Sequence, residues 1–363
     1  MGSFLGFIFG PLILVGAIVL LSWNEGRAVQ ALNGLSAAGQ VMVEADAGAV
    51  PAADEGKLVH VTGQASGAAP LSDPDLQVPF PGQIVVARTV QMYQWQEHKV
   101  SNNTRNAPSN GVSDGSYTYT YDRAWSETPI DSSGFYQAGH GNPPMPFSDA
   151  RWTASDAHLG GYALGEDTLK LASLTAAQTP TAPDGWTAAG GALVKGDPAA
   201  PQVGDLKVTY TGLANGSTLS VLAQQSHGGF GPYTAANGYQ LEMVDLGNVP
   251  AQAMITEQRN DETAMTWVLR VVGFFGIFAG VLMFLSPLSG IVGFVPILGS
   301  IARGAAFLAA MVVAVPTTLV VVALSWIVFR PVVGIGLLVA AVALLAGLRW
   351  IHGKAHPAAP SPA

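Results

Sequence analysis

The chain has 363 residues, and its 16 Lys plus Arg and 24 Asp plus Glu make up only 11 % of them. Soluble domains average about 25 % charged residues, and the mean hydropathy here is positive, at +0.34. These values exclude an ordinary soluble enzyme, a disordered protein and a nucleic-acid binder with a basic face. They indicate a membrane protein.

The charges divide the chain into three parts. Residues 1–23 carry no charged side chain, residues 24–262 carry 11 basic and all 24 acidic side chains, and residues 263–363 carry five basic and no acidic side chains. The middle part is still poor in charge, at about 15 % against a soluble norm of about 25 %. We infer that part of its surface is covered by another protomer, by a partner or by the bilayer.

The first part predicts a transmembrane anchor over residues 1–23. Phe4–Ser22 is continuously apolar and is followed by Trp23, a residue type enriched at membrane interfaces. A span needs roughly 20 apolar residues. The segment has no basic start and no small-residue cleavage site, so we interpret it as an uncleaved anchor rather than a signal peptide.

The last part predicts a C-terminal membrane cluster over residues 267–350. Its expected elements are three spans, at 267–285, 304–329 and 331–348, and one short interfacial or re-entrant segment at 288–301. Pro287 and Pro296 interrupt the apolar run that contains the first span and this segment. A Pro/Ala-rich tail, 351–363, follows. Four spans would place both termini on one side, but Lys and Arg are nearly equal in number on the two sides and do not assign the orientation.

The middle part, 24–266, predicts an antiparallel β-rich extramembrane domain, so the fold class is an α+β membrane protein. Alternating patterns predict strands at 83–97 and 117–125, joined by a Ser/Asn/Gly-rich loop. Further strands are expected at 58–62, 205–211 and 218–224. A helix at 252–267 leads into the second span.

The sequence contains no catalytic or metal-binding constellation. There is no cysteine, so thiolate metal sites, Cys nucleophiles and disulfides are excluded. The only H-x-x-x-H spacing is His352 with His356 in the Pro/Ala-rich tail, where a solvated tail is the preferred interpretation. There is no G-x-S-x-G nucleophile motif. We therefore expect no catalytic residues, no metal site, no cofactor and no enzymatic activity.

Aromatic residues alternate along the two strands that flank the long loop. Tyr117, Tyr119, Tyr121 and Trp125 share one face of the second strand, and Tyr93 and Trp95 share a face of the first. The preferred interpretation is the core face of a sheet. The alternative is a platform that binds carbohydrate or peptide.

The membrane spans contain few polar residues. Thr317 and Thr318 follow Pro316, where their hydroxyls are expected to satisfy backbone groups freed by the proline; the alternative is a pore-lining role. Gly276 and Gly280 have the spacing that lets two helix backbones approach closely, within the chain or between protomers.

Several short motifs occur in the same order as in one known family. They are Trp23-Asn24-Glu25-Gly26-Arg27, Met92-Tyr93-Gln94-Trp95-Gln96-Glu97, Tyr119-x-Tyr121-x-x-x-Trp125, Gly204-Asp205-Leu206-Lys207-Val208 and Phe329-Arg330-Pro331. Together they resemble the transmembrane protein 43 family, also called LUMA, over nearly the whole chain. The Ala/Gly-rich texture and the Pro/Ala tail are typical of a bacterial member.

The resemblance implies an architecture and a localisation. Animal members are integral proteins of the endoplasmic reticulum and inner nuclear membrane, with the large domain on the lumenal side. They are thought to self-associate and to organise membrane-protein complexes, and they have no established catalytic residues. By analogy, this chain is expected in a bacterial inner membrane with its large domain in the periplasm.

The leading functional hypothesis is a non-enzymatic membrane scaffold that self-associates. Its expected partners are the lipid bilayer, further copies of the chain and other membrane proteins, and not nucleic acid. The alternatives are a channel or transporter component and a periplasmic ligand-binding domain on a membrane anchor. At the membrane surface, Glu25 and Arg27 are expected to pair with Arg270 or Glu262; alternatively, Arg27 binds lipid headgroups.

Overall fold

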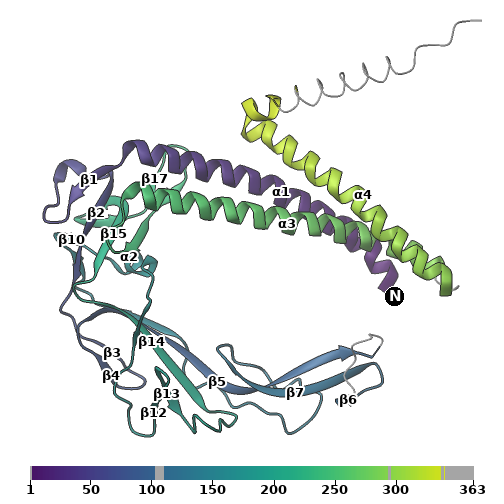
Figure 1. Cartoon of the computed structure of the whole chain (residues 1–363), viewed down its shortest axis with the longest axis horizontal. Helices are drawn as coiled ribbons and strands as arrows, with labels where there is room; N and C mark the ends of the chain where they lie inside the picture. Colours follow the sequence, from purple (N-terminus) through teal and green to yellow (C-terminus); the bar gives the residue numbers. More distant parts are fainter. Residues whose placement is uncertain (1, 103–109, 293–295, 337–338, 340–363) are drawn as a thin grey trace, which may run out of the picture. The chain divides into compact units, whose positions relative to one another are not determined.

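The computed structural model describes residues 2–102, 110–292, 296–336 and 339, which form two compact units (Figure 1). The helical unit comprises the described residues of Met1–Gln40, Thr234–Gln240 and Ile255–Ala363. The β-rich unit comprises those of Val41–Tyr233 and Leu241–Met254.

The helical unit is built on three long helices, which are α1 (Gly2–Val41), α3 (Ala251–Val292) and α4 (Pro296–Phe329). Among the described residues, three stretches are long and apolar enough to cross a membrane: Gly6–Val41, Ala251–Leu285 and Gly304–Phe329. The expected segment 288–301 is divided between the end of α3 and the start of α4. Most of the expected span 331–348 lies outside the described residues, and its first residues, 331–336, are helical.

Helix α1 continues well beyond the expected anchor, from Trp23 to Val41. Small and apolar side chains recur on one face of this extension, where Ala28, Ala31, Leu35 and Ala38 are all buried. Their spacing of three or four residues is that of a buried helix stripe. This stripe stabilises α1 as one helix through and beyond the apolar segment.

Glycines allow α1 and α3 to touch along their apolar halves. A Cβ added to Gly10 would lie 2.7 Å from the Gly280 carbonyl oxygen, and one added to Gly276 would lie 2.8 Å from the Ala17 Cβ. Such contacts are too short for a side chain. Gly276 and Gly280 therefore lie where α1 and α3 meet, as small residues do in closely packed membrane helices.

This contact predicts that Gly10→Val destabilises the protein by about 1–3 kcal/mol, because overpacking displaces neighbouring atoms. Gly16→Val is the matched control on the same helix, since nothing lies within 4 Å of a Cβ at Gly16. Thermal unfolding of both variants in mild detergent measures the difference. Equal unfolding temperatures would contradict a tight contact at Gly10.

The β-rich unit contains two main sheets and two small strand pairs. One sheet has seven strands in the order β1-β2-β9-β10-β16-β15-β19, and β2 also pairs with β15, which closes a ring of strands. These strands are β1 (Val43–Asp46), β2 (Leu58–Ser66), β9 (His158–Leu159), β10 (Tyr162–Ala163), β15 (Thr218–Ser226), β16 (Gly229–Gly231) and β19 (Met243–Leu246). Only the β1–β2 and β10–β16 pairs of this sheet are parallel.

The second sheet has eight strands, all paired antiparallel. Its order is β12-β13-β14-β5-β7-β6, with β11 on β14 and β8 on β5. The strands are β5 (Gln83–Ser101), β6 (Val112–Ser113), β7 (Tyr117–Ser126), β8 (Ala150–Thr153), β11 (Ala176–Gln178), β12 (Thr187–Ala189), β13 (Ala192–Lys195) and β14 (Leu206–Ala214). The expected antiparallel β-rich middle region is thereby confirmed.

Short elements complete the unit. They are the strand pair β3 (Leu71–Asp73) with β4 (Val78–Phe80), the 3-10 turn Ala52–Asp54 and the helix α2 (Glu166–Leu171). The second strand pair, β17 (Tyr233–Thr234) with β18 (Gln240–Leu241), includes the first and last residues of the segment Thr234–Gln240, which belongs to the helical unit. The core draws on both main sheets. Val85, Val86 and Val208 come from one, and Leu219 and Val221 come from the other.

A buried charge cluster lies inside the β-rich unit. The fully buried Asp73 carboxylate accepts hydrogen bonds from Arg88 Nη1 at 2.7 Å and from the Tyr210 hydroxyl at 2.7 Å. Burial opposes the charge on Arg88, but Asp73 and Asp75 outweigh it and raise the Arg88 pKa. Burial, together with the Asp73 hydrogen bond, also raises the Tyr210 pKa well above its usual value.

The raised pKa of Tyr210 predicts a stability loss at alkaline pH. An unfolded tyrosine ionises near pH 10, so the folding contribution of Tyr210 is complete below about pH 10 and falls by about 1.4 kcal/mol per pH unit above it. Tyr210→Phe should be about 1.5–3 kcal/mol less stable at pH 8, because a hydrogen bond to a charged group is lost. Between pH 10 and 11 it should lose less stability than the wild type. Unfolding curves of both proteins at pH 8, 10 and 11 test this. Equal losses of stability in the variant and the wild type between pH 10 and 11 would argue against it.

Candidate functional site

A cluster of charged and polar side chains joins the three long helices beside their interface tryptophans. It consists of Asn24, Glu25 and Arg27 of α1, Glu262, Thr266 and Arg270 of α3, Trp326 of α4, and Tyr239 of the loop 234–240. We call it the interfacial cluster. Asn24 and Glu25 are fully buried, although both follow directly on an exposed Trp23.

The Glu25 carboxylate is the centre of this cluster. Arg270 binds it through two hydrogen bonds, from Nε to Oε1 at 2.7 Å and from Nη2 to Oε2 at 2.9 Å. The indole Nε1 of Trp326 donates a third, at 2.7 Å. A planar guanidinium matches a carboxylate in this two-bond geometry. A single buried carboxylate thus connects α1, α3 and α4.

Aromatic rings cover the Arg270 guanidinium. Its central carbon lies 4.8 Å from the centre of the Trp267 ring and 5.8 Å from that of Trp326. Cation–π contacts of this kind are strengthened where water is excluded. The charge of Arg270 is therefore balanced by both a carboxylate and two indoles at the edge of the apolar region.

A second ion pair lies next to the first, between Arg27 and Glu262. Thr266 adds two contacts between α3 and α1, because its backbone oxygen accepts a hydrogen bond from Asn24 Nδ2 at 3.1 Å while its hydroxyl lies 3.5 Å from Arg27 Nη2. The Tyr239 hydroxyl faces Glu262 at 3.4 Å, and burial together with that negative charge raises the Tyr239 pKa. Both expected ion pairs, Glu25–Arg270 and Arg27–Glu262, are present.

The chemistry of the interfacial cluster favours positioning over catalysis. Each of its two carboxylates is neutralised by an arginine, and Glu25 accepts three hydrogen bonds. Within the described parts of the chain, no group of three His, Asp or Glu side chains is placed to hold a metal ion.

The polar membrane residues Thr317 and Thr318 lie beside Pro316 in α4. Thr318 lines an apolar groove of about 380 Å³ between α3 and α4, together with Trp267, Phe274 and Trp326. Its hydroxyl oxygen is buried and has no hydrogen-bond partner among the described residues. The expected hydrogen bond from this hydroxyl to the backbone is therefore not formed.

The aromatic face of β5 and β7 is only partly a core face. The two strands continue as a pair, residues 93–101 with 117–125, beyond the end of β14 at Leu206. We call this pair the β5–β7 arm. Only Tyr119 of its aromatic residues is buried, and Tyr117 is 39 % exposed. The expected core face is therefore buried only in part, because the arm extends past the strands that cover the core.

The aromatic side chains of the β5–β7 arm mainly contact one another and the segment 135–140. Tyr93 packs on Trp125, Tyr119 stacks on Tyr136 at 4.3 Å between ring centres, and Tyr121 stacks on His140 at 3.9 Å. His140 also meets the Trp95 ring edge-on. These contacts occupy the ring faces, which disfavours the carbohydrate or peptide platform.

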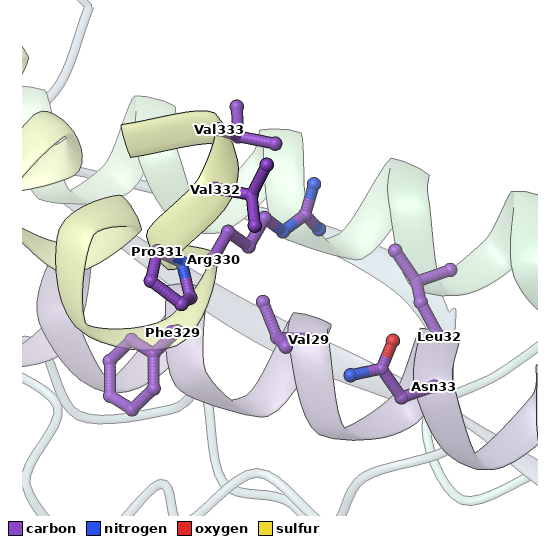
Figure 2. A pocket seen from close by; sticks show the side chains of 8 residues that line it. All are labelled: Val29, Leu32, Asn33, Phe329, Arg330, Pro331, Val332 and Val333. Atoms are coloured by element: carbon purple, nitrogen blue, oxygen red, sulfur yellow. The ribbon is translucent and has the colours of Figure 1, made fainter. Parts of the chain in front are cut away.

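The last predicted motif, Phe329-Arg330-Pro331, forms the turn after α4. With Val332 and Val333 it lines a pocket of about 370 Å³ whose other wall is Val29, Leu32 and Asn33 of α1 (Figure 2). The Phe329 ring packs against Gly26, where an added Cβ would lie 2.8 Å from the ring. Gly26 and Arg330 therefore belong to neighbouring parts of one surface.

Sequence reasoning missed three members of the interfacial cluster, namely Thr266, Tyr239 and Trp326. Trp326 follows an apolar segment, and its position there does not reveal that its indole N–H has a buried acid as its partner. Tyr239 lies in a loop far from the helices in sequence, so no local pattern marks it. The buried stripe from Ala28 to Ala38 is the signal that would have extended α1 and placed Glu25 inside a helix contact.

The fold and this cluster define an integral membrane protein with three described span-length helices and a large β-rich domain. The family model described as Transmembrane protein 43 matches residues 92–331. The chain therefore belongs to the transmembrane protein 43 family. No solved structure matches it.

Relatives are similar over nearly their whole length. The Transmembrane protein 43 homolog of Drosophila melanogaster is 30 % identical over 350 residues, which cover 92 % of this chain and 91 % of that protein. Transmembrane protein 43 of Homo sapiens is 27 % identical over 365 residues, covering 94 % and 88 %. That of Rattus norvegicus is 27 % identical over 351 residues, covering 90 % and 85 %.

The central position of Glu25 predicts that Glu25→Gln destabilises the helical unit by roughly 3 kcal/mol, since it leaves the Arg270 charge without its counter-ion. Glu257→Gln, at an exposed position of α3, should have an effect within about 0.5 kcal/mol. Adding Arg270→Met to Glu25→Gln should recover part of the loss. Unfolding in mild detergent measures all three variants, and a harmless Glu25→Gln would exclude this role for the cluster.

Proposed function

We propose that this protein is a non-enzymatic integral membrane scaffold that self-associates and organises other membrane proteins. The observation that carries the proposal is the β5–β7 arm, which extends past the strands that cover the core and is packed by the irregular segment 135–142 rather than by a second sheet. An isolated two-stranded hairpin is marginally stable in water. An arm of this length is better explained if a second copy of the chain covers it.

The surface of the β5–β7 arm supports this interpretation. Large apolar or aromatic side chains are exposed at its loop end, where Tyr117 of the arm is 39 % exposed and Val112 of the adjoining strand β6 is 40 % exposed. Aromatic residues of this kind are enriched in protein interfaces. The low charge of the middle region, about 15 % against a soluble norm of about 25 %, also favours a partly covered surface.

A side chain covers part of the backbone edge of β5 in the arm, where a strand of another chain could otherwise pair. At Trp95 the outer edge of β5 is occupied by the side-chain amide of Asn142, which accepts from the Trp95 N–H at 2.7 Å and donates to its carbonyl at 3.0 Å. Covered strand edges resist aggregation. Association is therefore expected through the side-chain face of the arm rather than through its backbone.

The interfacial cluster supports a positioning role for the helical unit. Its paired charges hold α1, α3 and α4 together and leave no free acid or base for catalysis. We place the protein in a bacterial inner membrane with its β-rich unit in the periplasm. The composition and the family's lumenal domain motivate this assignment.

Self-association predicts that the full chain in nanodiscs or mild detergent forms particles larger than a monomer. Val112→Ser combined with Tyr117→Ser should shift the population towards monomers by at least tenfold in dissociation constant, because exposed interface anchors are removed. Leu171→Ser, which also changes an exposed apolar residue of the β-rich unit, is the matched control. Mass photometry over a concentration series measures the distributions. A wild type that stays monomeric at micromolar concentration would refute the proposal.

A channel or transporter component is the second candidate, and one observation favours it. Thr318 lines the groove between α3 and α4, and its buried hydroxyl has no hydrogen-bond partner among the described residues, although a polar group in an apolar region requires one. Ion or solute flux across proteoliposomes discriminates the two functions. Flux that is abolished by Thr318→Leu would favour the channel over the scaffold.

A further inference from the structure

The pocket of about 370 Å³ beside Arg330 combines one cation with apolar walls (Figure 2). Val29 and Leu32 of α1, and Pro331, Val332 and Val333 after α4, provide apolar surface, and Asn33 adds a neutral amide. The Arg330 side chain extends from the end of α4 towards the lining residues of α1. We call this the Arg330 pocket.

The Arg330 pocket lies at the depth of lipid headgroups. The exposed Trp23 and Trp267, together with Trp326, mark the membrane interface on the three helices. Arg330 follows Trp326 by four residues, which is about 6 Å along a helix axis. The headgroup layer occupies roughly 5–8 Å on each side of the hydrocarbon core. A cation one turn beyond the tryptophans is therefore level with lipid phosphates.

The positive charge of Arg330 is not neutralised by the described part of the chain. None of the ion pairs formed by described residues includes Arg330. The two acids of the interfacial cluster already have partners, since Glu25 binds Arg270 and Glu262 binds Arg27. An arginine in a partly apolar pocket favours a bound anion with which it can form two hydrogen bonds.

We propose that the Arg330 pocket binds an anionic phospholipid. Arg330 donates hydrogen bonds to the lipid phosphate, and the Asn33 amide contacts the polar headgroup. Val29, Leu32 and the residues after Pro331 pack against the glycerol region and the first methylenes of an acyl chain. A phosphate held in this way ties the end of α4 to α1 and adds a lipid-dependent contact beside the interfacial cluster.

The test uses the full chain in mild detergent, with phosphatidylglycerol or phosphatidylcholine of the same acyl chains added. Phosphatidylglycerol should raise the unfolding temperature more than phosphatidylcholine and should remain bound in native mass spectra. Arg330→Gln should weaken phosphatidylglycerol binding at least tenfold. Arg259→Gln, which removes the same charge from α3 outside the pocket, should leave binding unchanged.

Two further variants separate binding from folding. Val332 is 85 % exposed, so Val332→Trp should fold normally while its larger side chain narrows the pocket and reduces phosphatidylglycerol binding. Arg330→Lys keeps the charge but loses the two-bond geometry, and it should retain part of the preference for phosphatidylglycerol. Lipid-free unfolding temperatures of all variants report whether the fold is intact.

Three outcomes would overturn the proposal. The first is that Arg330→Gln and Val332→Trp bind phosphatidylglycerol as the wild type does. The second is that Arg259→Gln loses binding as much as Arg330→Gln, which would indicate a general charge effect. The third is that inorganic phosphate alone stabilises the protein as much as the lipid does and displaces it, which would indicate a site for a free anion.

Discussion

The helical unit depends on one buried carboxylate. Glu25 is fully buried beside an apolar segment, where an unpaired charge would be very unfavourable. It is held by Arg270 of α3 and by Trp326 of α4, so the charge can only be accommodated when the three helices are together. Such a pair contributes little net stability against an apolar replacement, but it specifies one arrangement of the helices. The glycine contacts between α1 and α3 then bring the helices close enough for this arrangement.

The β-rich unit also contains a buried carboxylate that connects several elements. Asp73 is buried among Arg88 and Tyr210 and fixes the pair β3–β4 against β5 and β14. In both units a buried acid is satisfied by an arginine and by an aromatic donor. A chain with few charges thus places some of them in its interior, where each one constrains several elements at once.

The groups that stabilise the fold differ from those that are available to bind other molecules. The interfacial cluster has all its charges paired, whereas the β5–β7 arm exposes aromatic residues and the Arg330 pocket presents a cation that no described residue neutralises. These two features carry the proposals that the protein associates with further copies of itself and that it binds an anionic lipid.

The sequence by itself determined the apolar segments, the antiparallel middle region, the family and the pairing of Glu25 and Arg27 with Arg270 and Glu262. These follow from hydropathy, from alternation and from the requirement that buried charges find partners. Only the tertiary structure decided that α1 continues to Val41, that Trp326 and Tyr239 join the cluster, and that the aromatic face of β7 lies on an arm beyond the core. The stripe from Ala28 to Ala38 has a helical period in the sequence, but its burial and the other features depend on which distant segments pack there.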